Sequence, residues 1–375
     1  MMGANVSCPG KLMLSGEWSV LENGVPCIVL AVDSRVSATA KESKAFELHA
    51  PDVRLEHIKG TIEKSTISWT TALDEKQADA ILLPKAAIET ALKFLHGMGI
   101  AVKTFSVETS SKISSVALPN GEKKKIGFGS SAAAVVAIVA SVLKLHGVDV
   151  SSRKGKDLVY KLAALAHFLG QGKVGSGFDI CASVFGGATV YTRFDAQWLS
   201  QEVESGKQLS ELAEADWNGY SAEPIELPAD FKLCVGWTKT SASTKELVLK
   251  IREFKKENEG DYWKVINAIK GVTEQLIVAI NASDKEKILV LLKQNRVLLK
   301  ELSDKSKNNL ETPELAKLAD LADALGAAGK FSGAGGGDCG IAVCFDDDSA
   351  ENVKKAWKEN GIVPVDVKIS EKGAE

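Results

Sequence analysis

The stretch KFSGAGGGDCGIAVCF (residues 330–345) places five glycines within eight residues, between a helix pattern and a strand pattern. A second glycine-rich stretch, GFGSSAAA (residues 127–134), opens a long apolar helix earlier in the chain. Glycine allows backbone torsions that are closed to other residues, and it lets a ligand approach the bare main chain. Two such loops with serine at their edges suggest two walls of one polyphosphate site. The first hypothesis is therefore a small-molecule kinase.

Composition limits the class of protein further. The 375 residues are 45% hydrophobic and 25% charged, which is typical of a globular enzyme with two domains. The net charge of −3 provides no overall basic field, so we expect no nucleic-acid partner and no membrane partner. The longest apolar run, residues 132–143, is far shorter than the roughly 20 residues that cross a bilayer. Six scattered cysteines without CxxC spacing indicate reduced thiols in a cytoplasmic protein, and we expect a monomer or a homodimer.

Strand and helix patterns are interleaved in both halves of the chain, which predicts an α+β class. Strands are expected at residues 5–8, 12–14, 27–32, 35–40, 105–109, 188–194, 231–237, 340–345 and 363–369. Helices are expected at residues 85–97, 131–146, 156–169, 180–185, 244–254, 262–282, 285–302, 313–327 and 350–360. The acidic segment 196–228 ends in prolines and is the best candidate for a domain junction. We therefore predict an N-terminal domain (1–225) that binds ATP and a C-terminal domain (226–375).

The first glycine loop combines two features of an anion site. Gly127 and Gly129 let a phosphate approach the main chain, and the helix that follows directs unpaired N–H groups and its positive dipole end at the ligand. Ser130 and Ser131 can cap the helix, donate to phosphate oxygens or bind Mg²⁺. The alternative is a capped core helix with no ligand. The spacing matches neither the P-loop nor the dinucleotide fingerprint.

Asp179 and Lys11 are the candidate reactive side chains. Asp179 falls in the first helical turn after the turn GSG (residues 175–177), where the helix dipole also favours any ordinary carboxylate. Phosphoryl transfer tolerates a weak base, because positioning and charge neutralisation contribute more than proton abstraction. Lys11 follows a Pro-Gly turn and could stabilise a phosphate or a substrate oxygen, although an isolated lysine is more often a solvated surface residue.

The second glycine loop lies between a helix and a strand rather than between domains. Ordering so many glycines costs backbone entropy, which a ligand-binding loop explains better than a linker does. The alternative is a tight glycine corner at a packed helix–strand joint. The pattern leaves open whether Asp338, which ends the loop, contacts a ligand or only shapes the loop.

Four motifs, taken in order, resemble the GHMP kinases, a family that includes galactokinase, homoserine kinase and mevalonate kinase. They are PGKLMLSGEWSVL, GFGSSAAAVVA, GSGFD and SGAGGGDCGIA, and together they span almost the whole chain. QGKVGSGFD, GWTKTSAST and the pair Asp338-Cys339 are similar to the phosphomevalonate kinase branch of that family. The resemblance implies a two-domain α+β GHMP fold with the active-site cleft between the domains. It also implies ATP and Mg²⁺ as cofactors.

The resemblance implies a role for each matching residue. The ATP phosphates would be wrapped by Gly127, Phe128, Gly129, Ser130, Ser131 and Ala132, with Ser131 also a metal ligand. Asp179 would orient or deprotonate the attacking oxygen, and Lys11 would stabilise the charge that develops on it. Contacts to the acceptor substrate would come from Ser15, Glu17, Lys173, Ser176, Lys239, Ser332, Gly333, Ala334 and Gly335.

The chain departs from the family pattern at one point. Mevalonate-kinase-like members carry a Mg²⁺-contacting glutamate on the helix before the GSG turn, whereas AALAHFLGQGK offers His167 and no carboxylate there. The expected substrate is 5-phosphomevalonate, because Lys173 and Lys239 would supply the extra positive charge that a phosphorylated acceptor needs. Mevalonate kinase and a non-catalytic metabolite-sensing paralogue remain the alternatives.

Overall fold

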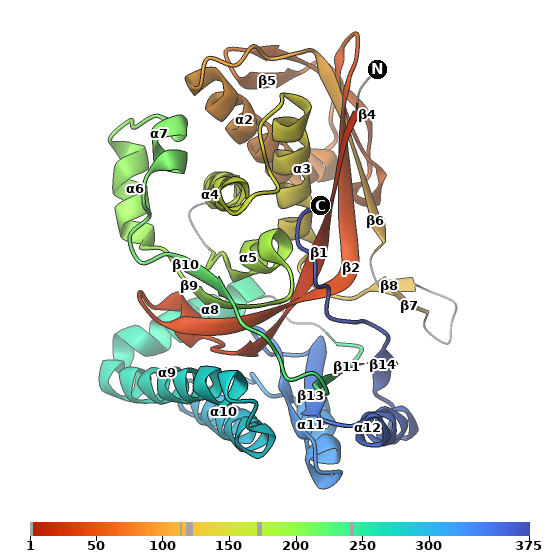
Figure 1. Cartoon of the computed structure of the whole chain (residues 1–375), viewed down its shortest axis with the longest axis vertical. Coiled ribbons are helices and arrows are strands. Elements are labelled where there is room, and N and C mark those ends of the chain that lie inside the picture. The colour runs from red at the N-terminus through yellow and green to blue at the C-terminus, as the bar shows by residue number, and fades with distance from the viewer. Residues whose placement is uncertain (1–2, 113–114, 118–122, 171–174, 241–243) are drawn as a thin grey trace.

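The computed structural model describes residues 3–112, 115–117, 123–170, 175–240 and 244–375, which form two main sheets and a short hairpin (Figure 1). The first sheet has the strand order β10-β9-β2-β6-β3-β4-β5, with β1 paired to β2. Its strands are β1 (Gly3–Ser15), β2 (Pro26–Glu42), β3 (Phe46–Ala50), β4 (Leu55–Glu63), β5 (Thr66–Trp69), β6 (Phe105–Lys112), β9 (Ala188–Thr192) and β10 (Ser221–Pro224). The separate hairpin consists of β7 (Ser115–Ala117) and β8 (Lys123–Lys125).

The first sheet carries its helices on one face (Figure 1). They are α1 (Glu75–Ala80), α2 (Leu82–Gly97), α3 (Ser130–Leu145), α4 (Arg153–Gly170), α5 (Phe178–Phe185), α6 (Ala196–Glu204) and α7 (Leu209–Glu214). α3 and α5 pack directly on β1 and β2, and α2 and α4 pack against α3. Because α3 is apolar nearly all round, it is buried between the sheet and the outer helices.

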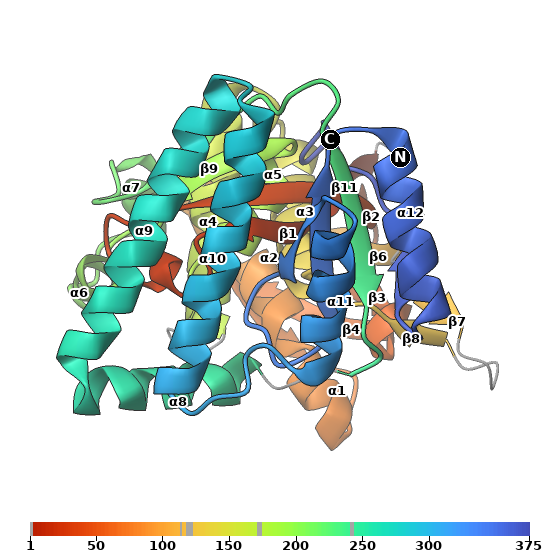
Figure 2. The same ribbon diagram turned by 90° about the horizontal axis from the view of Figure 1, so that it is seen from below.

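The second sheet has the order β12-β13-β11-β14, and its neighbouring strands are antiparallel. Its strands are β11 (Lys232–Trp237), β12 (Ala328–Phe331), β13 (Cys339–Cys344) and β14 (Val363–Val365). The helices of this half are α8 (Thr244–Glu257), α9 (Glu259–Asn281), α10 (Lys285–Lys305), α11 (Pro313–Ala324) and α12 (Asp347–Glu359). α11 and α12 cover one face of the sheet, whereas α9 and α10, a pair of long helices in Figure 2, share a core with the other face.

β1 and β2 contribute side chains to two cores. Met13, Val29 and Ala31 point into the core under α3 and α5. Their neighbours Leu12, Leu30 and Val32 point the opposite way and join the core that contains the second sheet, α9 and α10. Successive side chains of a strand alternate between its faces, so the same two strands bind the two halves of the molecule together.

The last residues of the chain return to the first sheet. After β14, the tail pairs with Ser7 through Glu375, whose N–H and carbonyl bond to the Ser7 main chain at 3.1 and 2.8 Å. The N–H of Gly187 donates to Ser370 at 2.7 Å, and that of Ala374 donates to Val184 at 3.1 Å. Figure 1 shows this end of the chain beside β1. The expected strand 363–369 therefore stops at Val365, because the residues beyond it leave the second sheet.

Two features of the secondary structure differ from those expected from the sequence. Pro9-Gly10 is not a turn: β1 runs through it with a shift of register, and the missing N–H of proline is tolerated because β1 pairs only with β2 in the described chain. The segment 196–228, the candidate domain junction, forms α6, α7 and β10 of the first half and buries Trp217 in the first core, and β11 of the second sheet follows it. The helix expected at 313–327 ends at Ala324, and β12 follows it.

No helix within the described ranges is both long enough and apolar enough to cross a membrane. All six cysteines are buried.

Candidate functional site

Lys11 lies on β1 directly beside the first glycine loop. Its main-chain N–H donates to the carbonyl of Phe128 at 2.8 Å. Gly10 makes this approach possible, since a Cβ at that position would lie 2.6 Å from the same carbonyl oxygen. The close contact between strand and loop fixes where the Lys11 side chain starts.

Gly129 connects that loop to α3. It is the N-cap of the helix with φ 76°, a left-handed torsion that favours glycine. A Cβ at Gly129 would lie 3.0 Å from Lys11 Cγ and 3.8 Å from Asp179 Cβ. Because the N-cap is a glycine, Ser130 and Ser131 are inside the helix and do not occupy the capping position considered for them. Ser131 is exposed at the first turn.

Asp179 occupies the first turn of α5, as the sequence predicts. Two buried tyrosines stabilise the turn before it. The Tyr191 hydroxyl donates to the carbonyl of Ser176 at 2.6 Å, and the Tyr160 and Tyr191 hydroxyls are 2.7 Å apart. The neighbouring Phe178 ring has its centroid 5.7 Å from Lys11 Nζ. α5 thus directs Asp179 and Phe178 toward the side of the glycine loop where Lys11 lies.

The second glycine loop approaches the same lysine from the other half of the molecule. A Cβ at Gly333 would lie 3.9 Å from Lys11 Nζ. Lys11, Gly129, Asp179 and Gly333 come from four separate segments. The structure places Gly129 and Gly333 against the Lys11 side chain and Asp179 beside Gly129. This is an arrangement suited to transferring an anionic group between two ligands.

Comparison with known proteins agrees with this geometry. Residues 83–187 match the family model of the GHMP kinases N terminal domain, and residues 276–363 match that of the GHMP kinases C terminal domain. A phosphomevalonate kinase of Streptomyces sp. (strain CL190) is 30% identical, with 95% of this chain and 94% of that protein aligned. The chain belongs to the GHMP kinase family.

Two further relatives of this GHMP kinase match it along almost its whole length. A mevalonate kinase of Pyrococcus furiosus is 30% identical, with 98% of this chain and 96% of that protein covered. The solved structure of Streptococcus pneumoniae phosphomevalonate kinase in complex with phosphomevalonate and AMPPNP has a TM-score of 0.80 at 26% identity, covering 98% of this chain and 99% of that one. The two-domain α+β GHMP fold is therefore the fold of this chain.

The oxygen ligands that Mg²⁺ prefers are present at the convergence point. Ser131 is exposed at the start of α3, and the Asp179 Cβ lies 3.8 Å from the Cβ position of Gly129, the residue that begins this helix. No group of three His, Cys, Asp or Glu side chains among the described residues could hold a metal ion alone. These residues fit an ion that is bound mainly by nucleotide oxygens and water, with one or two protein ligands.

Phe128 and Ala132 can serve a nucleotide only through their main chains. Their side chains are 1% exposed and lie in the core. The expectation that they wrap the ATP phosphates therefore applies to their backbone groups alone.

Ser15 and Glu17, both expected to contact the acceptor, are instead buried and engaged inside the protein. The Ser15 hydroxyl lies 2.8 Å from that of Thr273 on α9. Glu17 forms an ion pair with Lys330, the residue of β12 that precedes Phe331 and the glycine loop. Burial raises the pKa of Glu17 and lowers that of Lys330, because a low-dielectric interior disfavours both charges. This geometry favours a positioning role for the two residues over contact with a substrate.

The second loop is fixed in place by its own contacts. The Ser332 hydroxyl donates to the carbonyl of Met13 at 3.0 Å and accepts the Met13 N–H at 2.8 Å. Gly335 passes so close to Leu310 that a Cβ would lie 2.4 Å from its carbonyl oxygen. Ala334 packs against a neighbouring apolar cluster. Ser332 therefore joins β1 to the loop, and Gly333 is the loop residue that faces Lys11.

The two expected phosphate-binding lysines stay predictions. Lys173 lies outside the described residues, and Lys239 is exposed on the turn after β11 with φ 66°. Ser176 is buried, and its carbonyl accepts a hydrogen bond from the Tyr191 hydroxyl.

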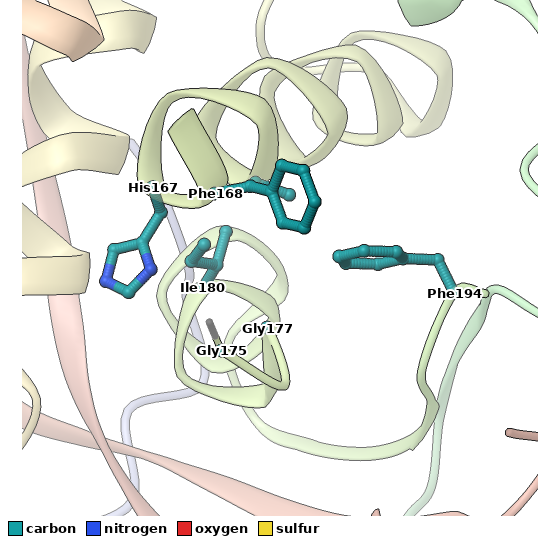
Figure 3. Close-up of a pocket in the computed structure, with 7 residues that line it drawn as sticks. His167, Phe168, Gly175, Gly177, Ile180 and Phe194 are labelled. Carbon is teal, nitrogen blue, oxygen red and sulfur yellow. The ribbon is translucent and has the colours of Figure 1, made fainter. Parts of the chain in front are cut away.

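A small pocket lies nearby, between α4 and α5. Its lining residues are Ala164, His167, Phe168, Gly175, Gly177, Ile180 and Phe194. Figure 3 shows Phe168 and Phe194 facing each other there, but its volume of about 10 Å³ admits one water molecule rather than a substrate.

The sequence did not identify three buried residues that support the site, namely Lys330, Tyr160 and Tyr191. Lys330 had a usable signal, since it is a lone charge inside the apolar strand β12. Tyr160 and Tyr191 had none, because buried aromatic residues on a helix and a strand are indistinguishable from ordinary core.

Proposed function

We propose that this GHMP kinase transfers the γ-phosphoryl group of ATP to the phosphate of 5-phosphomevalonate. The observation that supports phosphoryl transfer is the placement of Gly129 and Gly333 against the Lys11 side chain, with Asp179 beside Gly129. The choice of acceptor is supported by similarity to phosphomevalonate kinases along nearly the whole chain. In the reaction the bond between the γ-phosphorus and the ADP oxygen breaks, and a bond from that phosphorus to an acceptor phosphate oxygen forms. The products are ADP and 5-diphosphomevalonate.

The proposed roles of the side chains follow from the acceptor. A phosphate oxygen is already ionised near neutral pH, so the enzyme needs no strong base. Asp179 orients the acceptor and receives the proton of a monoprotonated phosphate, while Lys11 stabilises charge on the transferring group. The N–H groups at the start of α3 bind the nucleotide phosphates. Ser131, together with the nucleotide oxygens, would hold Mg²⁺, which would neutralise part of the phosphate charge.

Mevalonate kinase is the second candidate, because a mevalonate kinase of Pyrococcus furiosus has the same 30% identity to this chain as the Streptomyces phosphomevalonate kinase. A coupled ADP-release assay with mevalonate, phosphomevalonate, homoserine and galactose separates the two. We expect ADP release with phosphomevalonate alone. Release with mevalonate alone would replace the proposed acceptor, and ATP binding without release on any of the four would favour the non-catalytic paralogue.

A further inference from the structure

Asp338 ends the second glycine loop, and its main chain is clamped on both sides. Its N–H donates to the carbonyl of Thr240 at 2.5 Å, and its carbonyl accepts the Thr238 N–H at 2.9 Å and the Thr238 hydroxyl at 3.0 Å. Its φ of 62° lies in the left-handed region, which aspartate tolerates better than most residues. The clamped backbone fixes the direction of the carboxylate.

That carboxylate lies against the first glycine loop. The main-chain N–H of Gly127 and the indole N–H of Trp237 both donate to it. A Cβ at Gly127 would lie 2.0 Å from Asp338 Oδ2, so a side chain at that position would displace the carboxylate. The Gly127 N–H expected to wrap a phosphate is thus engaged by Asp338, and the two glycine loops are joined through this contact.

A carboxylate at this position is unfavourable for a polyphosphate ligand, since like charges repel. Lys11 provides the compensating charge: burial raises the pKa of Asp338, and the attraction of the Lys11 ammonium opposes that shift. Lys11 itself packs against Gly129 of the first loop and Gly333 of the second. The acidic group and the lysine therefore lie where both loops meet.

We propose that Asp338 is a positioning residue, whose carboxylate locks the two glycine loops together and holds the Lys11 ammonium at the transfer point. The proposal rests on the proposed function for its kinetic readout. Asp338 does not need to touch either substrate for this role, because it acts through Gly127 and Lys11.

Two substitutions separate the lock from the charge. Asp338→Ala removes both, and we expect kcat to fall on the order of 10²-fold with a higher KM for ATP, because the loops and Lys11 lose their alignment. Asp338→Asn keeps an oxygen that accepts the Gly127 N–H and removes only the charge. We expect it to restore the KM for ATP to within about twofold of wild type while kcat stays about tenfold low.

A double-mutant cycle with Lys11→Ala tests the second part of the proposal. If Asp338 acts through Lys11, adding Asp338→Asn to Lys11→Ala lowers kcat no further than Lys11→Ala does alone. Fully additive effects in this cycle would contradict the role assigned to Lys11.

Asp323→Asn is the matched control. Asp323 also accepts a glycine N–H, from Gly329 at 3.0 Å, and pairs with a cation, Arg296, at 2.9 Å, but it lies on α11 and its glycine partner belongs to strand β12 rather than to a glycine loop. We expect its kcat to remain within about twofold of wild type after correction for folded protein. An equal loss of kcat in Asp323→Asn and Asp338→Ala, or wild-type kcat in Asp338→Ala, would overturn the proposal.

The wild-type protein distinguishes failure of the proposed function from failure of this inference. If it turns over none of the four acceptors, the proposed reaction is wrong, and the variants are then compared by ATP dissociation constant. The lock still predicts at least about fivefold weaker ATP binding in Asp338→Ala and near-wild-type binding in Asp338→Asn. Unchanged ATP binding in Asp338→Ala would then overturn the lock.

Discussion

At the scale of the residue, the surroundings of the Lys11 side chain are set by the fold. In the sequence it is one of many lysines, whereas in the structure its stem lies against Gly129 and its Nζ faces Gly333. Asp179 gains its position from α5, and Gly129 leaves the space between the two side chains open. Neither residue has chemical significance without this placement.

Lys11→Ala and Asp179→Ala should each lower kcat at least about tenfold while ATP binding is largely kept, since each acts on the transferring group rather than on the nucleotide. Turnover by the coupled assay and ATP binding by titration calorimetry measure the two quantities separately. Suitable controls are Lys41→Ala, an exposed lysine on β2, and Asp348→Ala, an exposed acid in the first turn of α12. Near-wild-type kcat in both site variants would refute the assignment.

Lys173→Ala and Lys239→Ala test the phosphate contacts expected from the sequence. If these lysines bind the acceptor phosphate, the KM for phosphomevalonate should rise about tenfold or more, while the KM for ATP changes little. Lys317→Ala, which removes a lysine on α11, serves as the control. A parallel rise in both KM values would indicate a general effect on the site instead.

At the scale of the element, the start of α5 depends on one glycine. Gly177 has φ 78°, and a Cβ there would lie 2.8 Å from the hydroxyls of both Tyr160 and Tyr191. The tyrosines support the turn from below, and the turn sets the first helical residues, Asp179 among them. The position of Asp179 therefore depends on the turn and on the two tyrosines that contact it.

Gly177→Ala should destabilise the protein and also lower kcat, because the left-handed torsion and the clash act together on the turn. Gly206→Ala is the matched control, since Gly206 has φ 81° with no atom within 4 Å of the Cβ position. We expect Gly206→Ala to cost about 1 kcal/mol of unfolding free energy with kcat unchanged, and Gly177→Ala to cost more. Equal costs in urea unfolding, with kcat unchanged in both variants, would show that the tyrosine contact is irrelevant.

At the scale of the whole molecule, the two halves are joined through shared strands and a buried charge pair. One face of β1 and β2 contributes side chains to the first core, and the opposite face contributes to the second. The last residues of the chain bond back to β1. Glu17, which follows β1, pairs with Lys330 on β12 with both side chains at most 1% exposed. The pair fixes β12, and hence the second glycine loop, relative to the strand that carries Lys11.

Lys330→Met should lower the unfolding free energy by about 3–5 kcal/mol, because it leaves the Glu17 carboxylate buried without its partner. Adding Glu17→Gln should recover part of that loss, which a double-mutant cycle in urea measures. Lys285→Met, which breaks the exposed pair with Asp230, should have a smaller effect. A cycle with no coupling between Glu17 and Lys330 would contradict this account.

Much of the local structure was predictable from the sequence. Apolar periodicity located α2, α3 and α4 closely, since each buries one face or all of its surface. The prediction failed where distant contacts override local signals. Pro9-Gly10 resembles a turn, yet the pairing of β1 with β2 carries the strand through it.

The sequence by itself determined the two glycine loops, the helix starts that present Ser131 and Asp179, and the family to which the chain belongs. These depend on torsions and motifs within a few residues, and glycines and helix starts can be recognised from the local sequence alone. Only the tertiary structure decided that Lys11 lies between the loops, that Asp338 rests on Gly127, and that Glu17 is paired rather than exposed. Contacts between residues far apart in the chain depend on how sheets and helices pack, and that packing is a property of the whole fold.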